Sequence, residues 1–240
     1  MAVNRDPKSS ESSDLDRADT SSRILDAAER LVQLRGFNGF SYADVASELK
    51  ITKASLHYHY PGKADLGRAL VERYASRFAE ALDDIDQRER DPIAKLEAYA
   101  KIYADVLSEG RMCLCGMLAA GYDTLPPTMQ EAVIEYFDVN EAWLMSVLDR
   151  GVAEGKLVLS GSPREAAQAI VSGLEGAMLI ARPYDDVGRF DSAAVPTARQ
   201  PGSRRPSISS QPLAFASLAP AEQAAKDLDE QHASLITTAL

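Results

Sequence analysis

Residues 20–74, TSSRILDAAERLVQLRGFNGFSYADVASELKITKASLHYHYPGKADLGRALVERY, decide the fold of this chain. Thr20, Ser21 and Ser22 signal a helix start, because their hydroxyls accept hydrogen bonds from the free amides of a first turn. Gly36 ends the helix, since glycine readily adopts the left-handed conformation found at helix ends. Between these signals one face carries apolar residues at helical spacing: Ile24, Leu25, Ala28, Leu31 and Val32. We therefore predict a first helix that supports its neighbours.

Two shorter helices are predicted after Gly36. In the first, capped by Ser41, the inward positions are Val45, Ala46 and Leu49, and the outward positions are Asp44 and Glu48. Thr52 caps the second, which ends before Pro61 and Gly62. Two short helices joined by so brief a link form a helix-turn-helix, whose second helix lies in the major groove of DNA.

The second helix of this pair carries groups suited to reading DNA. Hydroxyl, imidazole and ammonium groups remain available on it, and one lysine follows its end: Thr52, Lys53, Ser55, His57, Tyr58, His59 and Lys63. Phosphate contacts fix the register on the duplex, whereas contacts with base edges carry the sequence information. We assign bases to Lys53 and Ser55, and the phosphate backbone to Tyr58, His59 and Lys63.

Two alternative roles remain for the aromatic residues of this helix. Leu56 and Tyr60 are expected to point inward. The alternative to a DNA contact, for both Tyr58 and Tyr60, is that the ring only closes the small core. His57 and His59 are not expected to bind a metal, because they lie two residues apart on a helix without a nearby Cys or carboxylate to complete a site.

Three motifs add a family resemblance. They are the pairs Gly36-Phe37 and Gly39-Phe40, the pattern D-V-A-x-x-L at 44–49, and the pattern K-x-S-L-x-x-H-Y at 53–60 followed by a lysine. In these motifs, over about 55 residues without a gap, the chain resembles the DNA-binding domain of the TetR family of bacterial transcriptional regulators. His57 departs from the tyrosine usual in that family, and Gly62 from serine or asparagine. These departures affect one DNA contact and the turn before Lys63.

The net charge of −10 is unevenly distributed. Residues 20–80 hold nine Lys and Arg against seven Asp and Glu, a net of +2 that leaves −12 for the rest. A local positive module favours a specific regulator over a nucleoid or coating protein, which needs positive charge along the whole chain. No apolar run reaches the roughly 18 residues needed to span a bilayer, and the start MAVNRDPKSSESSD is not a signal peptide. We expect a cytoplasmic protein.

Beyond residue 63 the apolar residues keep helical spacing, and no segment alternates as strands do. The predicted fold is all-α, with an N-terminal three-helix helix-turn-helix domain and a larger helical domain. Helices are expected from Lys63 to the charged stretch 83–91, and over 92–108, 113–120, 128–154 and 163–181. The predicted organisation is a disordered arm (1–19), a DNA-binding domain (20–66), an effector-binding and dimerisation domain (67–186) and a low-complexity, disordered tail (187–240). The tail is either an appended interaction segment or a readthrough or frameshifted end.

The family resemblance implies partners for the larger domain. It implies a homodimer that packs through 143–152 and 167–181, with part of each row serving the internal core instead. It also implies a small-molecule effector, whose binding moves the helix after Lys63 and releases operator DNA. The shortage of charged residues among the candidates for its site suggests that the effector is apolar or aromatic. The side chains expected to line the effector site, each with the alternative of a core position, are Tyr103, Cys113, Met117, Tyr122, Phe137 and Met145.

Cys113 and Cys115 are the only cysteines. One hypothesis is a thiol sensor of oxidants or electrophiles, in which Arg111 lowers a thiol pKa. The alternative is that two soft side chains fill a core helix. A helical thiol oxidoreductase is the competing enzyme class, but no paired base, phosphate loop or metal cluster accompanies the thiols. We expect no enzymatic activity, no cofactor and no metal.

Overall fold

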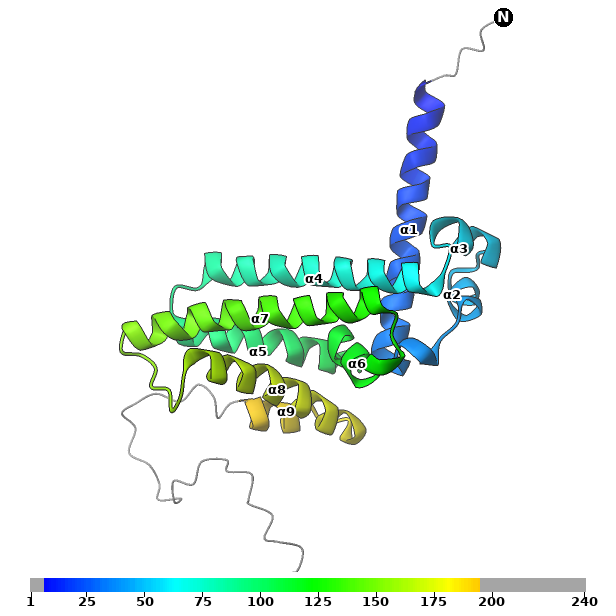
Figure 1. Ribbon diagram of the computed structural model, residues 1–240. Helices are drawn as coiled ribbons and strands as arrows, with labels where there is room; N and C mark the ends of the chain where they lie inside the picture. Colours follow the sequence, from blue (N-terminus) through cyan, green and yellow to red (C-terminus); the bar gives the residue numbers. More distant parts are fainter. Residues whose placement is uncertain (1–6, 195–240) are drawn as a thin grey trace, which may run out of the picture. The chain divides into compact units, whose positions relative to one another are not determined.

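The computed structural model describes the backbone of residues 7–194 and the side chains of residues 17–193, and throughout this range the regular elements are helical (Figure 1). The α-helices are α1 (Pro7–Arg35), α2 (Tyr42–Leu49), α3 (Lys53–His59), α4 (Lys63–Arg88), α5 (Pro92–Ser108), α6 (Leu114–Ala120), α7 (Pro127–Ala153), α8 (Pro163–Ala181) and α9 (Val187–Ala194). The predicted all-α class is confirmed.

The helix starts follow the capping signals of the sequence. The Ser41 amide donates a hydrogen bond to Asp44 Oδ2 (2.7 Å), which closes the first turn of α2. Thr52 Oγ1 accepts from the Ser55 amide (3.1 Å) at the start of α3. Ser162 and Glu165 form a capping box at the start of α8: the Glu165 amide donates to the Ser162 hydroxyl oxygen, and the Ser162 amide donates to the Glu165 carboxylate. Each such cap stabilises its helix by about 1 kcal/mol.

Helices α1, α2 and α3 share one small core. Ile24, Ala28 and Val32 of α1 are fully buried, as are Val45 of α2 and Leu56 of α3. The turn between α2 and α3 passes through Lys50 and the end of α1 through Gly36, both with positive φ (55° and 77°). These two left-handed residues keep the links short, so that α3 lies across the end of α2.

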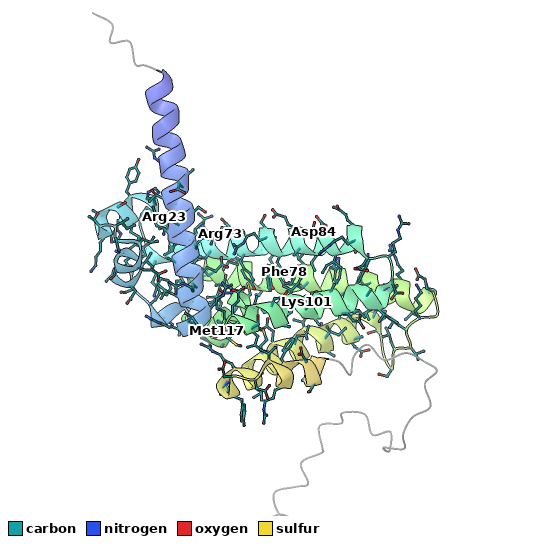
Figure 2. All side chains as sticks on the ribbon, turned by 180° about the vertical axis from the view of Figure 1, so that it is seen from behind. Arg23, Arg73, Phe78, Asp84, Lys101 and Met117 are labelled. Atoms are coloured by element: carbon teal, nitrogen blue, oxygen red, sulfur yellow. The ribbon has the colours of Figure 1, made fainter. Side chains whose placement is uncertain are left out.

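The larger domain is built on α4, α5, α7 and α8, which run side by side (Figure 1). An aromatic layer lies between α4, α5 and α7, with Phe78 (Figure 2) at its centre and the rings of Tyr99, Tyr103 and Tyr136 within 6.3 Å of it, centroid to centroid. Edge-to-face aromatic pairs of this kind contribute about 1 kcal/mol each beyond the area they bury. This layer gives the domain a rigid interior beside the cavity described below.

An ion-pair cluster joins the two domains where α1 crosses α4. Glu29 of α1 is 6% exposed and receives hydrogen bonds from Arg73 (2.9 Å) and Arg77 of α4. Arg73, labelled in Figure 2, also donates to Asp26 Oδ1 (2.8 Å). The cluster therefore fixes α4, which begins next to α3, against the helix that supports the DNA-binding unit.

The start of α1 differs from the prediction. We predicted a disordered arm over residues 1–19 and a helix start at Thr20 to Ser22, but α1 already begins at Pro7. The Ser21 hydroxyl hydrogen-bonds with Tyr60 Oη (2.8 Å), so it makes a tertiary contact inside a longer helix. A serine-rich composition alone did not reveal this contact.

The predicted tail also starts too early. Residues 187–194 form α9, which packs against α5 and α8 and whose Phe190 is 1% exposed. Val187, one turn before Phe190, also packs against the core, but a helix of eight residues is too short for this spacing to be recognised in the sequence. Positions 195–240 of the predicted tail lie outside the described residues.

Candidate nucleic-acid interface and internal cavity

Helix α3 presents one side to the exterior. Leu56 is fully buried and Tyr60, just after the helix, is 9% exposed, so these two residues anchor α3 as predicted. Five of the predicted DNA-binding residues are exposed or half-buried on its remaining surface: Lys53, Ser55, His57, Tyr58 and His59. Thr52 is also exposed, and its hydroxyl serves as the helix cap. The arrangement leaves one ammonium, two imidazoles and two hydroxyls on a continuous helical surface.

His57 is held in place by a residue that the sequence analysis missed. The ring of Tyr42 lies 4.8 Å from the ring of His57, and the Tyr42 hydroxyl donates to the Tyr60 carbonyl (2.9 Å). His57 Nδ1 also lies 3.1 Å from the Pro61 carbonyl oxygen. Burial, with smaller contributions from Asp65 and Tyr60, raises the pKa of Tyr42 to about 12, so its phenol remains a donor at neutral pH. An aromatic residue directly after the Ser41 cap was the available signal.

A second overlooked residue lies over Tyr58. The Tyr58 ring is 64% exposed, which excludes the alternative of a core role. The guanidinium carbon of Arg17, on α1, lies 5.3 Å from the centre of that ring. Arg17 was missed because it fell in the segment predicted to be disordered. The contact places an additional positive charge beside the exposed surface of α3.

Lys63, which was predicted to contact phosphate, makes several contacts within the protein. Its ammonium donates to the Phe37 and Phe40 carbonyls (both 2.6 Å) and lies 4.7 Å and 4.3 Å from the centres of their rings. Burial lowers the pKa of this ammonium. Lys63 therefore fastens the link between α1 and α2 with two of the three N–H donors of its ammonium group.

Replacing Lys63 with methionine tests how much these hydrogen bonds stabilise the fold. We expect a loss of about 2 kcal/mol in the free energy of unfolding, because two charge-assisted hydrogen bonds disappear while the apolar stem remains. Urea titration followed by circular dichroism measures it, with the exposed Lys101→Met as control. Unchanged stability together with a reduced salt dependence of DNA binding would restore the phosphate role.

The larger domain contains a cavity of about 460 Å³ between α6, α7 and α8. Its walls are mainly apolar and small side chains, interrupted by two carboxylates. The lining residues are Met112, Gly116, Met117, Ala119, Ala120, Phe137, Glu141, Val171, Ser172, Glu175, Gly176 and Leu179. A volume of this size accommodates a small organic molecule.

Only two of the six predicted effector residues line this cavity. Met117 and Phe137 line it, whereas Tyr103, Cys113, Tyr122 and Met145 do not. Tyr103 is 2% exposed and hydrogen-bonds with Tyr99 (3.1 Å between hydroxyl oxygens), so it belongs to the aromatic layer. Tyr122 lies in the short 3₁₀-helix after α6, where its carbonyl accepts from Gln130 (2.9 Å).

Glu175 is the lining residue with the most unusual surroundings. Its Oε1 atom is buried without a hydrogen-bond partner among the described residues. Burial raises the pKa of Glu175 from 4.5 to about 7, and a hydrogen bond with Cys113 partly opposes this rise. The sequence analysis missed it, although Glu175 lies four residues after buried Val171 and three before buried Met178. A carboxylate in such an apolar stripe was the signal that could have identified it.

The thiol-sensor hypothesis loses its physical basis. Arg111, which was expected to lower a thiol pKa, donates instead to Gln33 Oε1 (3.0 Å) and pairs with Glu109. Burial and the neighbouring Glu175 raise the pKa of Cys113, and burial raises that of Cys115. Both thiols are buried and protonated, which is typical of core cysteines.

Helix α6 connects the cavity with the DNA-binding unit. Met117 lines the cavity, and its methyl group lies 3.8 Å from the position that a Cβ on Gly36 would occupy, at the end of α1 (Figure 2). Arg182, directly after α8, donates to the Leu34 carbonyl (2.6 Å). Asn38, between α1 and α2, donates to Thr124 Oγ1 (2.7 Å) after α6. These contacts, together with the packing of α6 against α1, connect the cavity lining with the end of α1.

Residues 7–194 contain neither a membrane-spanning helix nor a cluster of metal ligands. None of the helices in this range has the length and apolar character needed to cross a bilayer. Nor does the described part of the chain bring together three or more His, Cys, Asp or Glu side chains that could hold a metal ion.

Comparison with known proteins agrees with this architecture. Residues 24–70 match the family described as bacterial regulatory proteins, tetR family, and residues 92–197 match a Tetracyclin repressor-like C-terminal domain. A TetR-family transcriptional regulator from Agrobacterium tumefaciens has a solved structure with 33% sequence identity and a TM-score of 0.74, covering 76% of this chain and 97% of that one.

Curated relatives give the same result. The transcriptional regulator AcuR of Cereibacter sphaeroides is 26% identical over 152 residues, which are 62% of this chain and 69% of AcuR. The transcriptional repressor NemR of Escherichia coli is 27% identical over 170 residues, which are 68% of this chain and 84% of NemR. With both of its domains matched, the chain belongs to the TetR family of bacterial helix-turn-helix transcriptional regulators and is not an enzyme.

Proposed function

We propose that the protein is a cytoplasmic, homodimeric repressor that binds operator DNA through α3 and is released when a small molecule fills the cavity between α6, α7 and α8. The observation that carries this proposal is the shared helix α6, which lines the cavity with Met117 and packs against α1, where the same side chain lies near Gly36. The relative NemR, described as a repressor, supports repression as the direction of control.

The proposed release is a shift in population between two conformations. A ligand changes such an equilibrium only if it binds one conformation better than the other. A molecule that fills the cavity presses on Met117, displaces α6 against Gly36 and reorients α1 with the helix-turn-helix that it supports. The conformation favoured by the ligand then holds the two recognition helices of the dimer at a spacing that no longer matches two half-sites.

The proposed dimer surface is the outer face of α8. Ala167, Ile170, Leu174 and Met178 of the predicted dimer row are buried within the subunit, so this part of the row belongs to the core. The exposed side carries Ala169, Gly173 and Ile180, and beside them three residues that also line the cavity, Ser172, Gly176 and Leu179. No atom lies within 4 Å of a Cβ added at Gly173 or Gly176, which leaves room for the close approach of a partner helix. Leu179 and Ile180 are each 59% exposed.

Fluorescence anisotropy with DNA from upstream of the protein's own gene tests the proposed operator binding. We expect Lys53→Ala to lower the affinity about 10- to 100-fold, because a direct base contact contributes about 1–3 kcal/mol. Ser55→Ala should reduce the preference over a scrambled duplex. Lys101→Ala on α5, in an exposed ion pair with Asp105, is the control and should bind as the parent does.

The same samples test the other parts of the proposal. Sedimentation velocity should give a dimer at the protein concentrations used for binding. A parent protein that binds both duplexes equally, or a Lys53→Ala variant that binds as tightly as the parent, would contradict the role of α3.

A further inference from the structure

The cavity is lined by acidic groups, although most of its walls are apolar. Two carboxylates line it, Glu141 from α7 and Glu175 from α8, and its lining contains no Lys, Arg or His. The cations nearest to it along the chain already have partners: Arg111 pairs with Glu109, and Arg182 donates to the Leu34 carbonyl and to the sulfur of Met117 (3.9 Å), which lines the cavity. A ligand in this cavity therefore meets negative charge without a compensating positive group from the lining.

The two carboxylates differ in how they are satisfied. Glu141 Oε2 accepts a hydrogen bond from Gln168 Nε2 (3.2 Å). Glu175 Oε1, in contrast, is buried and has no donor within residues 17–193. An unpaired buried oxygen costs about 1–3 kcal/mol, and this cost disappears when a ligand supplies the donor.

Gly116 helps to keep the Glu175 carboxylate at the cavity. A Cβ on Gly116 would lie 2.1 Å from Glu175 Oε2 and 2.8 Å from its carboxyl carbon, so only glycine leaves room for the carboxylate there. The sequence thus provides space for a charged group at the wall formed by α6. Met112 and Phe137 provide apolar surface elsewhere in the same lining.

We propose that the effector is a protonated organic amine with an apolar body, whose ammonium donates to Glu175 and is further attracted by Glu141. This proposal rests on the proposed function and specifies the chemistry of its ligand. An N–H donor satisfies the free Oε1 atom, and a positive charge matches a lining that holds only acidic charges. The methionines and Phe137 cover the apolar body, and aromatic and thioether groups pack well against a ring beside a cation.

Three probes with one carbon skeleton separate charge from shape. We would titrate 4-phenylbutylamine, 4-phenylbutanol and 4-phenylbutyrate into the full-length protein by isothermal calorimetry at pH 8, where Glu175 is mainly ionised. The amine should bind at least tenfold more tightly than the alcohol, and the acid most weakly. Among the three, only the amine should also release the operator duplex in the anisotropy assay.

Three variants locate the effect. Glu175→Gln should remove the tenfold preference for the amine, and Glu141→Gln should reduce it. Glu135→Gln is the matched control, because Glu135 is also on α7 but is exposed and outside the lining. Circular dichroism confirms that each variant is folded before the titrations are compared.

The outcomes separate this proposal from the broader one. Equal or tighter binding of the alcohol or the acid, no amine binding at 1 mM, or a preference that survives Glu175→Gln would overturn the amine proposal. If the protein without a probe still prefers its own duplex, each of these results contradicts the amine proposal alone and leaves the proposed operator binding standing. Absence of that preference contradicts the proposed function, whichever probe binds.

Discussion

Replacing Glu29 with glutamine should lower the free energy of unfolding by about 3 kcal/mol, because it removes the central charge of a buried ion-pair cluster. Glu29 is 6% exposed and receives hydrogen bonds from Arg73 and Arg77, and the amide cannot balance their charges. Arg73 still pairs with Asp26 in this variant, so we expect a loss of stability at the lower end of the range of about 3–5 kcal/mol for breaking a buried ion pair. Urea denaturation at neutral pH measures the change.

A surface pair on α4, the helix that carries Arg73 and Arg77, provides the control. Glu72 pairs with Arg68 one turn away on α4, and both side chains are at least half exposed. Glu72→Gln should cost less than 1 kcal/mol, as solvent screens exposed ion pairs. If Glu29→Gln costs no more than this control, the cluster does not stabilise the junction of α1 and α4.

The second large effect concerns Glu175 and pH. Burial raises the pKa of Glu175 from 4.5 to about 7 in the folded protein, so the folded state holds this proton more tightly than the unfolded state does. Its protonation therefore favours folding below pH 4.5, and this advantage is lost as the pH rises through 7. The shift corresponds to about 3 kcal/mol.

Glutamine at position 175 removes this pH dependence. Glu175→Gln should be about as stable as the parent protein at pH 5 and more stable at pH 8, by up to about 3 kcal/mol. The groups that surround Glu175 are Tyr74, Tyr99, Tyr103, Cys113, Cys115 and Glu141. The pKa values of the phenols and thiols among them are raised, so these groups remain protonated over this range. Denaturation curves of both proteins at the two pH values decide the matter, and a constant difference between pH 5 and pH 8 would refute it.

Much of the fold could be predicted because its signals are local. Ser41, Thr52 and Ser162 mark helix starts with a side chain and an amide only three residues apart, and the structure begins α2, α3 and α8 directly after them. The exposed residues of α3 followed from the same short-range pattern, since Leu56 identifies the inward face.

Long-range contacts explain the errors. Lys63 is 26 residues from Phe37 along the chain, and no spacing rule indicated that its ammonium would reach that carbonyl. The contact of Ser21 with Tyr60, 39 residues away, was missed for the same reason. Ten of the twelve residues that line the cavity were missed because the cavity combines three helices. Glu175 was the exception, since its position on the apolar stripe of α8 was visible without a structure.

The division of labour around the cavity has a practical consequence. The charges that select the proposed ligand belong to α7 and α8, whereas the side chain that lies near Gly36 belongs to α6. Ligand selectivity and transmission of the signal to α1 thus depend on different helices. Exchanging Glu141 and Glu175 for neutral or basic residues while keeping Met117 is accordingly a route to biosensors that respond to new compounds through an unaltered output.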